Sequence, residues 1–420
     1  MTPEARTLPP VLRQFAWALA ALALFSLVYT YAVSYLLQTL HPYGVTLFWN
    51  AHVGSDLTTF AERSSHFGTP SYWNEFNYPF TYPAPIAPIF ALLFKLHHPL
   101  AAYWTLCVVG LTVWSIWLTR ELISAGVHIS QAAAFVLVTL TASWPIVLLL
   151  NTANIEGLLA IVLAAGVYAV LRDRCWLGAT LIGIATAMKL FPFILLALLL
   201  SKRRYREFVW GLVVAAITTL ASLALLGPTI AAAQRHIADG FRFINEAFIL
   251  STQRDALNYS HSLFSLLKFA VAVIARLLGQ PANHTLLSVS LGVYMVATAV
   301  AGLALYFGVI RKLPILNQLL ALTICAVLLP PLSADYTLLE LFLPFGLVCL
   351  YAAETRTAPD TPDLAPIFGC FAVLFGWETF LTVHYAFDRP LRAVVLTILL
   401  LLFLHQPLPW QRLDPAEATA

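Results

Sequence analysis

Ionisable side chains are scarce in this sequence, and Asp56 stands where a carboxylate can do chemistry. It lies in the segment GSDLTTFAERSSHF, whose apolar residues repeat at helical spacing after Ser55, a residue type suited to an N-cap. Backbone N–H groups in the first turn of such a helix lack partners and favour an ionised carboxylate. Asp56 is therefore a candidate reactive acid, or a residue that only stabilises the start of a helix.

Lys189 is the second candidate, because it stands between two apolar runs that are each too short for a full membrane crossing. Pro192 follows it, so we expect a hairpin of short helices there. A charge at depth in a bilayer costs about 3 kcal/mol or more on insertion scales, and such a residue usually faces a cavity or an anion. Lys189 would contact a phosphate, or would extend its side chain to the membrane interface.

Further polar candidates occur in other short segments between apolar runs. Glu156, beside Asn154, and Asp335 would each orient substrate hydroxyls or cap a helix. His261 would assist a phosphate, or act as an interfacial hydrogen-bonding residue. Arg254 would neutralise the charge of a phosphate group.

Membrane helices must position these residues. Of the 420 residues, 60% are hydrophobic and 10% are charged, compared with roughly 25% charged in soluble domains. Apolar runs such as 19–37 and 132–150 are long enough to cross the hydrocarbon core as helices. The sequence therefore predicts an all-α polytopic membrane protein, with 1–420 as one transmembrane domain. A net charge of +3 without a basic face argues against nucleic acid as a partner.

Short basic loops predict the orientation, because loops rich in lysine and arginine stay in the cytoplasm. These loops are 172–174, 202–206 and 311–312. Both termini are then cytoplasmic, and about twelve spans are expected near 14–37, 99–119, 132–150, 157–171, 176–188, 190–200, 208–227, 285–310, 315–331, 337–352, 366–384 and 391–405. The outside holds two long loops, 38–98 and 228–284.

The first outer loop is rich in rigid residues. It contains Tyr72, Tyr82 and several prolines, and such aromatic rings suit both sugar faces and the membrane interface. Its last part, 83–96, is a short apolar segment that we expect to be partly embedded in the membrane.

The order Asp56, Tyr72 and then Phe80–Pro85 resembles the first outer loop of glycosyltransferase family 87, polyprenyl-phosphate-mannose-dependent transferases of the GT-C superfamily. Three later segments are similar to other parts of that family, Met188–Pro192, Asn258–Leu263 and Pro330–Tyr336. The likeness covers roughly residues 50–350. The chain departs from the family at Asn151–Asn154, where Gly-Gln before an asparagine is frequent, and at Tyr259, where glutamine is frequent.

This resemblance implies a GT-C-like fold and transfer of a hexose from a polyprenyl-phosphate donor to an envelope lipid or glycan acceptor, with inversion. Asp56 would be the catalytic base, while Lys189, His261 and Arg254 would bind the donor phosphate. The implied substrate-binding residues are Tyr72, Tyr82, Asn154, Glu156, Asn258 and Asp335. A glycosyl phosphate carries its own stable leaving group, so one carboxylate suffices, whereas a glycosidase needs two.

The implied partners are a polyprenyl-phosphate-linked sugar donor, a lipid or glycan acceptor and membrane lipid. The implied location is the cell membrane, most simply a bacterial inner membrane, with the site on the outside. Mannose enters only because the family prefers it. No cofactor and no metal site are expected, since the five cysteines include no pair at metal-ligand spacing.

Two other classes of protein remain open at this point. A transporter or lipid flippase would also combine many helices, interrupted helices and buried charges, although related halves are not visible in the sequence. A structural subunit of an envelope-building complex would keep the fold without catalysis. Neither a phosphate-binding GxxxxGK[ST] loop nor an HExxH helix occurs.

Overall fold

The fold is helical throughout the part of the chain that the computed structural model describes. The described residues are 7–37, 53–73, 79–257, 259–279, 283–356, 362–377, 388–410 and 412–413. Within them every regular element is an α, 3-10 or π helix. The all-α prediction is therefore confirmed.

Five helices in these described ranges are long and apolar enough to cross a membrane. They comprise most of α1 (Pro10–Leu37), α5 (Pro99–Ser124), α11 (Tyr205–Leu226), α15 (His284–Gly308) with η4 (Ile310–Lys312), and η5 (Asp335–Leu341) with α17 (Phe342–Thr355). This length and composition make the chain a membrane protein.

The predicted span 132–150 is bent. α6 (Ile129–Thr141) and α7 (Trp144–Thr152) meet at an angle of 52°. Pro145 explains the break, because its ring clashes with the carbonyl four residues earlier and it donates no N–H. Seven shorter helical elements match the other expected spans: α8 (Glu156–Leu171), α9 (Cys175–Met188), η2 (Phe191–Leu196) with α10 (Ala197–Ser201), α16 (Ile315–Leu328), α18 (Ala365–Phe375) and α20 (Asp388–His405).

Over its described residues, each predicted span thus coincides with a helix, a helix pair or the bent segment, whereas residues 378–384 of the predicted span 366–384 lie outside the described residues. How many of these segments cross the bilayer, and whether the fold is GT-C-like, stay predictions.

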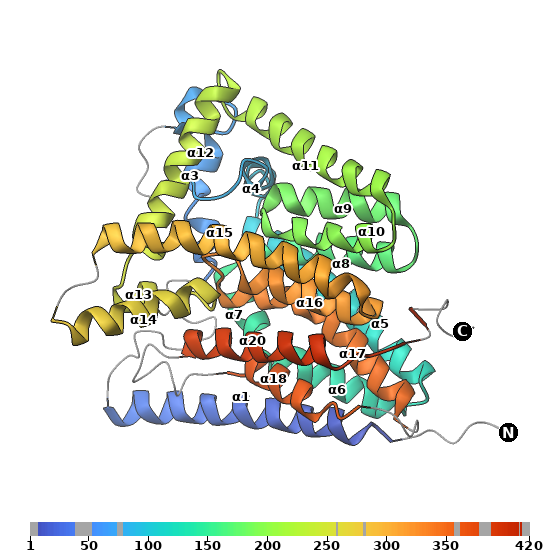
Figure 1. Cartoon of the computed structure of the whole chain (residues 1–420). Coiled ribbons are helices and arrows are strands. Elements are labelled where there is room, and N and C mark those ends of the chain that lie inside the picture. The colour runs from blue at the N-terminus through green and yellow to red at the C-terminus, as the bar shows by residue number, and fades with distance from the viewer. Residues whose placement is uncertain are drawn as a thin grey trace.

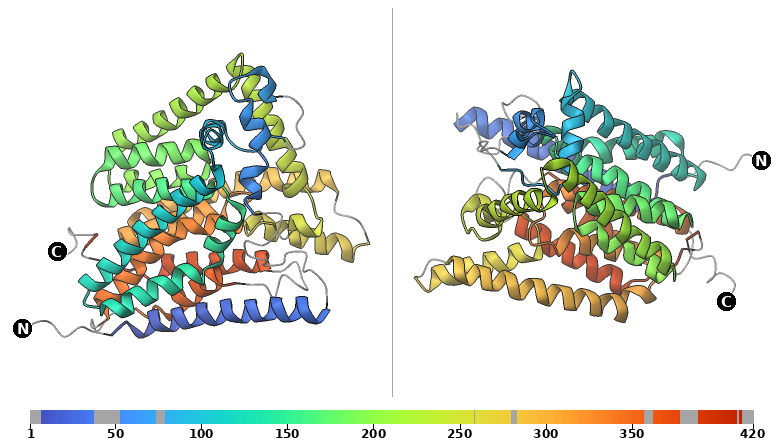
Figure 2. Two further views of the ribbon diagram at one scale, coloured as in Figure 1. Left: turned by 180° about the vertical axis from the view of Figure 1, so that it is seen from behind. Right: turned by 90° about the horizontal axis from the view of Figure 1, so that it is seen from above.

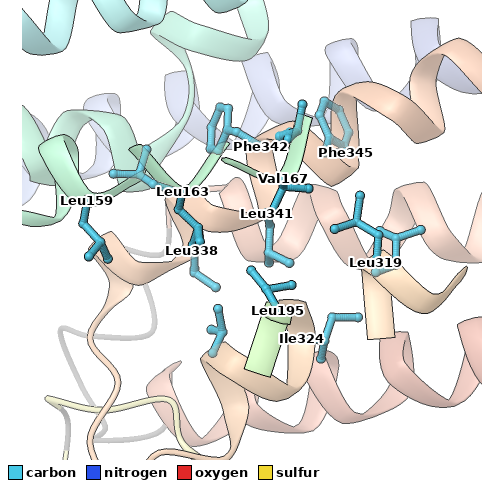
Figure 3. Close-up of a cluster of buried hydrophobic side chains, with 14 of the residues drawn as sticks. Leu159, Leu163, Val167, Leu195, Leu319, Ile324, Leu338, Leu341, Phe342 and Phe345 are labelled. Carbon is cyan, nitrogen blue, oxygen red and sulfur yellow. The ribbon is translucent and has the colours of Figure 1, made fainter. Parts of the chain in front are cut away.

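The centre of the bundle is formed by α16, η5 and α17. Every residue of α16 is buried, and the helix Asp335–Thr355 is buried along almost its whole length. A helix that is apolar on all sides packs in a core rather than at a surface. α8 and η2 pack around this centre, and Figure 3 shows Leu163, Leu195 and Leu319 meeting Leu341 in the resulting cluster.

The basic turns and both described chain ends gather at one end of the bundle, as Figure 1 shows. Lys202 Nζ donates to Asp173 Oδ1 at 2.7 Å, which joins the turn after α8 to the turn after α10. Arg356 Nη1 donates to Thr7 O at 2.7 Å. α8 begins at Glu156 and ends at Leu171, directly before the basic turn at 172–174.

Outer segments far apart in sequence pack on each other. The first contains α2 (Ser55–Thr58), α3 (Ala61–Ser65), η1 (Pro70–Trp73) and α4 (Ile86–Phe94). The interval 228–284 contains α12 (Ile230–Ile244), the π-helix η3 (Asn245–Ile249), α13 (Arg254–Leu257) and α14 (Leu263–Leu277). Figure 2 shows the first segment beside α12 from two further directions.

Two contacts join these segments. The Trp73 ring stacks on His236 of α12 with centroids 4.6 Å apart. Trp73 Nε1 also donates to the carbonyl of Leu226, the last residue of α11, at 2.7 Å. Gly240 of α12 lies directly on the backbone at Phe80, since a Cβ there would lie 1.8 Å from Phe80 O.

Replacing Gly240 with alanine is therefore expected to separate α12 from the loop at Phe80. Backbone atoms must move, so both thermal stability and activity should fall. Gly292→Ala is the matched control, because that glycine is also helical and a Cβ there meets no atom within 4 Å. Thermal unfolding of both variants in detergent measures the effect. Equal midpoints for the two variants would contradict this packing.

Candidate active site

Asp56 lies in the first turn of α2, which is attached to the end of α7. Gly54 donates its N–H to Asn151 O at 2.7 Å. Its φ of 75° is a left-handed conformation that glycine adopts readily. The expected N-cap at Ser55 is wrong, because Gly54 occupies that position and Ser55 is already helical. Leu57, on the same short helix, is buried and holds α2 in place.

Asn154 holds the Asp56 carboxylate. Its Nδ2 donates to Asp56 Oδ2 at 2.6 Å and to the hydroxyl of Tyr82 at 3.2 Å. Its Oδ1 accepts the backbone N–H of Glu156 at 3.0 Å, and its carbonyl accepts a hydrogen bond from Tyr103. The structure thus brings together three predicted site residues, Asp56, Tyr82 and Asn154.

The surroundings make Asp56 a stronger base than an aspartate in water. Burial raises the pKa of its carboxyl above the usual 3.8, whereas the hydrogen bond from Asn154 and the positive charge of Lys189 act in the opposite direction. The side chain keeps partial contact with solvent. Asp56 is therefore a basic carboxylate within electrostatic reach of a lysine.

Lys189 lies at the break between α9 and η2, as the predicted hairpin of short helices requires. Its backbone is extended, with φ −148° and ψ 140°. Its ammonium forms an ion pair with Glu156, which is fully buried, and lies 5.2 Å from the centre of the Tyr336 ring. Glu156 sits at the first turn of α8. Lys189 therefore turns into the protein towards an acid instead of extending to an interface.

Tyr336 lies between the Lys189–Glu156 pair and a second polar cluster, which contains Asp335 and His261. The sequence alone did not single out Tyr336. Its hydroxyl lies 3.3 Å from that of Tyr259. The neighbouring Asp335 accepts from Trp144 Nε1 at 2.9 Å and pairs with Arg392 at 2.8 Å. Only its place in the Pro330–Tyr336 turn hinted at a role for Tyr336.

His261 belongs to the second cluster. Its Nδ1 lies 3.3 Å from Asp335 Oδ1, and its Nε2 lies 3.1 Å from Ser333 Oγ. Both His261 and Asp335 are fully buried. The structure therefore pairs these two residues with each other and gives both ring nitrogens protein partners, while their contact with substrate stays a prediction.

The remaining predicted residues lie elsewhere or cannot be placed. Tyr72 is buried in the aromatic core of the first outer segment, where its carbonyl accepts from Arg63 at 2.7 Å. Burial raises the pKa of its phenol, and the nearby Arg63 charge opposes this. Arg254 begins α13 and its side chain is outside the description, as is Asn258 entirely.

Helix length and composition define a membrane protein, and Asp56, Asn154, Glu156 and Lys189 lie in one cluster of polar and charged residues within its helical bundle. The chain matches the sequence model of glycosyltransferase family 87 over residues 80–333, which is more than half its length. The chain therefore belongs to glycosyltransferase family 87. Comparisons with curated proteins and with solved structures find no match. The matched part includes Tyr82, Asn154, Glu156 and Lys189, whereas Asp56 precedes it.

Lys189→Met is expected to destabilise the protein by about 3 kcal/mol, because it leaves the buried Glu156 carboxylate without its cation. Adding Glu156→Gln should recover most of this loss, since an amide needs no counter-ion. Thermal unfolding of the single and double variants in detergent measures both changes. If the double variant were less stable than Lys189→Met alone, the ion pair between Lys189 and Glu156 would not be the interaction that stabilises this region.

Proposed function

We propose that this glycosyltransferase moves a hexose from a polyprenyl-phosphate donor to an envelope lipid or glycan, with inversion and with Asp56 as general base. Mannose is the first sugar to test because the family prefers it. The observation that carries the proposal is that a basic carboxylate, Asp56, lies within electrostatic reach of an inward-facing cation, Lys189, which is held by Glu156.

The chemistry needs one proton acceptor and one site for a phosphate. The acceptor hydroxyl attacks C1 of the sugar and gives its proton to the Asp56 carboxylate, while the bond from C1 to the phosphate oxygen breaks and its electrons leave with polyprenyl phosphate. Lys189 stabilises the negative charge on that phosphate. Asn154 and Tyr82 orient the base, and one displacement gives inversion at C1.

The side of the membrane follows from the basic turns. Residues 172–174 and 202–206 belong on the cytoplasmic side by the positive-inside rule. The length of α8 separates the turn at 172–174 from Glu156, which Asn154 links to Asp56. The site then opens on the non-cytoplasmic face of a bacterial inner membrane. There the polyprenyl tail of the donor stays in the outer leaflet while its head group reaches Asp56.

Family membership favours covalent transfer over the transporter and the structural-subunit alternatives. His261, Arg254, Glu156, Asp335, Asn258 and Tyr72 remain proposed contacts of donor or acceptor. The pairing of His261 with Asp335 supports a structural role for these two residues, which is to hold Tyr336 beside Lys189.

Asp56→Asn is expected to lower kcat by about 10²- to 10⁴-fold, the usual contribution of a general base. Its thermal stability should equal or exceed that of the natural protein, because the amide removes a charge that burial disfavours. Transfer of radiolabelled mannose from polyprenyl phosphate in membranes measures the first effect. Glu62→Gln, an exposed acid in the same segment, is the control and should remain active. An active Asp56→Asn enzyme would contradict the role of Asp56 as general base.

The pH dependence of kcat should reflect the titration of Asp56. Only the ionised carboxylate accepts a proton, so the rate is expected on a plateau above its pKa and to fall as pH drops through that raised value. Asn154→Ala removes a hydrogen bond that lowers this pKa, and should move the acid limb to higher pH. A limb that stays in place, or moves to lower pH, would contradict the assigned contact.

A further inference from the structure

Glu340 is a buried acid that the proposed mechanism does not use. It lies on η5, four residues after Tyr336, and is 6% exposed. Because η5 packs against α8, the carboxyl of Glu340 lies beside that of Glu156, and the two can share a hydrogen bond when one of them carries a proton. Taken as carboxylates, both oxygens of Glu340 and Oε1 of Glu156 have no hydrogen-bond donor among the residues that the structure describes.

Two acids therefore face a single lysine. Glu156 Oε2 takes the Lys189 ammonium, and a second carboxylate beside it would leave an uncompensated negative charge in the interior. One shared proton removes that charge and gives the orphaned oxygens a partner. A protonated Glu340 would donate to Glu156 Oε1, which is the oxygen that Lys189 leaves free.

The other neighbours of Glu340 supply no competing charge. The charges that act on it come from Glu156 on α8 and from Lys189 between α9 and η2. α7 contains no charged residue. Thr323 of α16 and Leu343 of α17 line a cavity of ≈ 20 Å³ together with Glu340. This volume is about that of one water molecule, and Thr323 and Glu340 are the polar residues among those that line it. Leu163, Leu195 and Leu319, which are labelled in Figure 3, line this cavity together with Glu340.

We propose that Glu340 is a positioning residue for the donor: it hydrogen-bonds the Glu156 carboxylate when Lys189 turns from that acid to the donor phosphate. The inference rests on the proposed function, in which Lys189 binds that phosphate. Without this hydrogen bond, movement of the lysine would strand a buried carboxylate, and Lys189 would stay on Glu156. Glu340 thus acts on donor affinity through two other residues and does not touch the reacting atoms.

The shared proton gives the proposal a pH signature. Loss of that proton at alkaline pH leaves two carboxylates holding Lys189, so donor binding weakens as pH rises. A glutamine at position 340 still donates to Glu156 from its amide but does not titrate. A leucine provides neither the hydrogen bond nor the proton.

The test measures binding of a short-chain polyprenyl phosphate to the full-length protein in nanodiscs, across a range of pH. Glu340→Leu is expected to raise Kd by about tenfold or more, because leaving one buried acid without a hydrogen-bond partner costs at least the free energy of a tenfold change in Kd. Glu340→Gln should bind as the natural protein does at neutral pH and lose the alkaline weakening. Thr323→Val, on the same cavity, is the matched control and should bind normally with the pH dependence retained.

The outcomes separate the two proposals. Normal binding by Glu340→Leu, combined with weak binding by Lys189→Met, would overturn the role of Glu340 and leave the phosphate site intact. If the natural protein failed to bind polyprenyl phosphate, the donor assignment and this inference would both fall. Should Glu340→Leu not fold, the glutamine variant decides: an unchanged alkaline weakening in it would overturn the role of Glu340.

Discussion

The ion pair between Lys189 and Glu156 is the interaction on which the rest of the site depends. A lysine inside a bundle of apolar helices is unfavourable unless an acid compensates it, and Glu156 at the start of α8 provides that acid. The pair sets the positive charge that Asp56 senses. It also places the cation against the Tyr336 ring.

Asn154 transmits this arrangement to the outer segment, because it hydrogen-bonds both Asp56 and the backbone of Glu156. One asparagine thus ties the candidate base to the helix that carries the buried acid. The base itself stands on a four-residue helix, which would be unstable alone. Packing of the outer segments, with α12 lying against the backbone at Phe80, keeps that short helix in place.

Hydropathy and charge were enough to locate the helices, since each expected span coincides with a helical segment. Local rules failed where backbone geometry decided: the cap of α2 fell to Gly54 with its positive φ, and the chain bends before Pro145. Contacts between side chains that are far apart in the chain could not be predicted from the sequence. Glu340 gave one usable signal, an acid inside an apolar span, but nothing in the sequence shows that it meets Glu156.

A structure of the protein with a bound polyprenyl phosphate tests the central claim most directly. The account predicts the phosphate within hydrogen-bonding distance of Lys189 Nζ, with the position of the sugar C1 next to Asp56. Electron density for the phosphate at the end of the bundle that carries the basic turns, or a lysine that remains on Glu156 with the phosphate bound elsewhere, would contradict it.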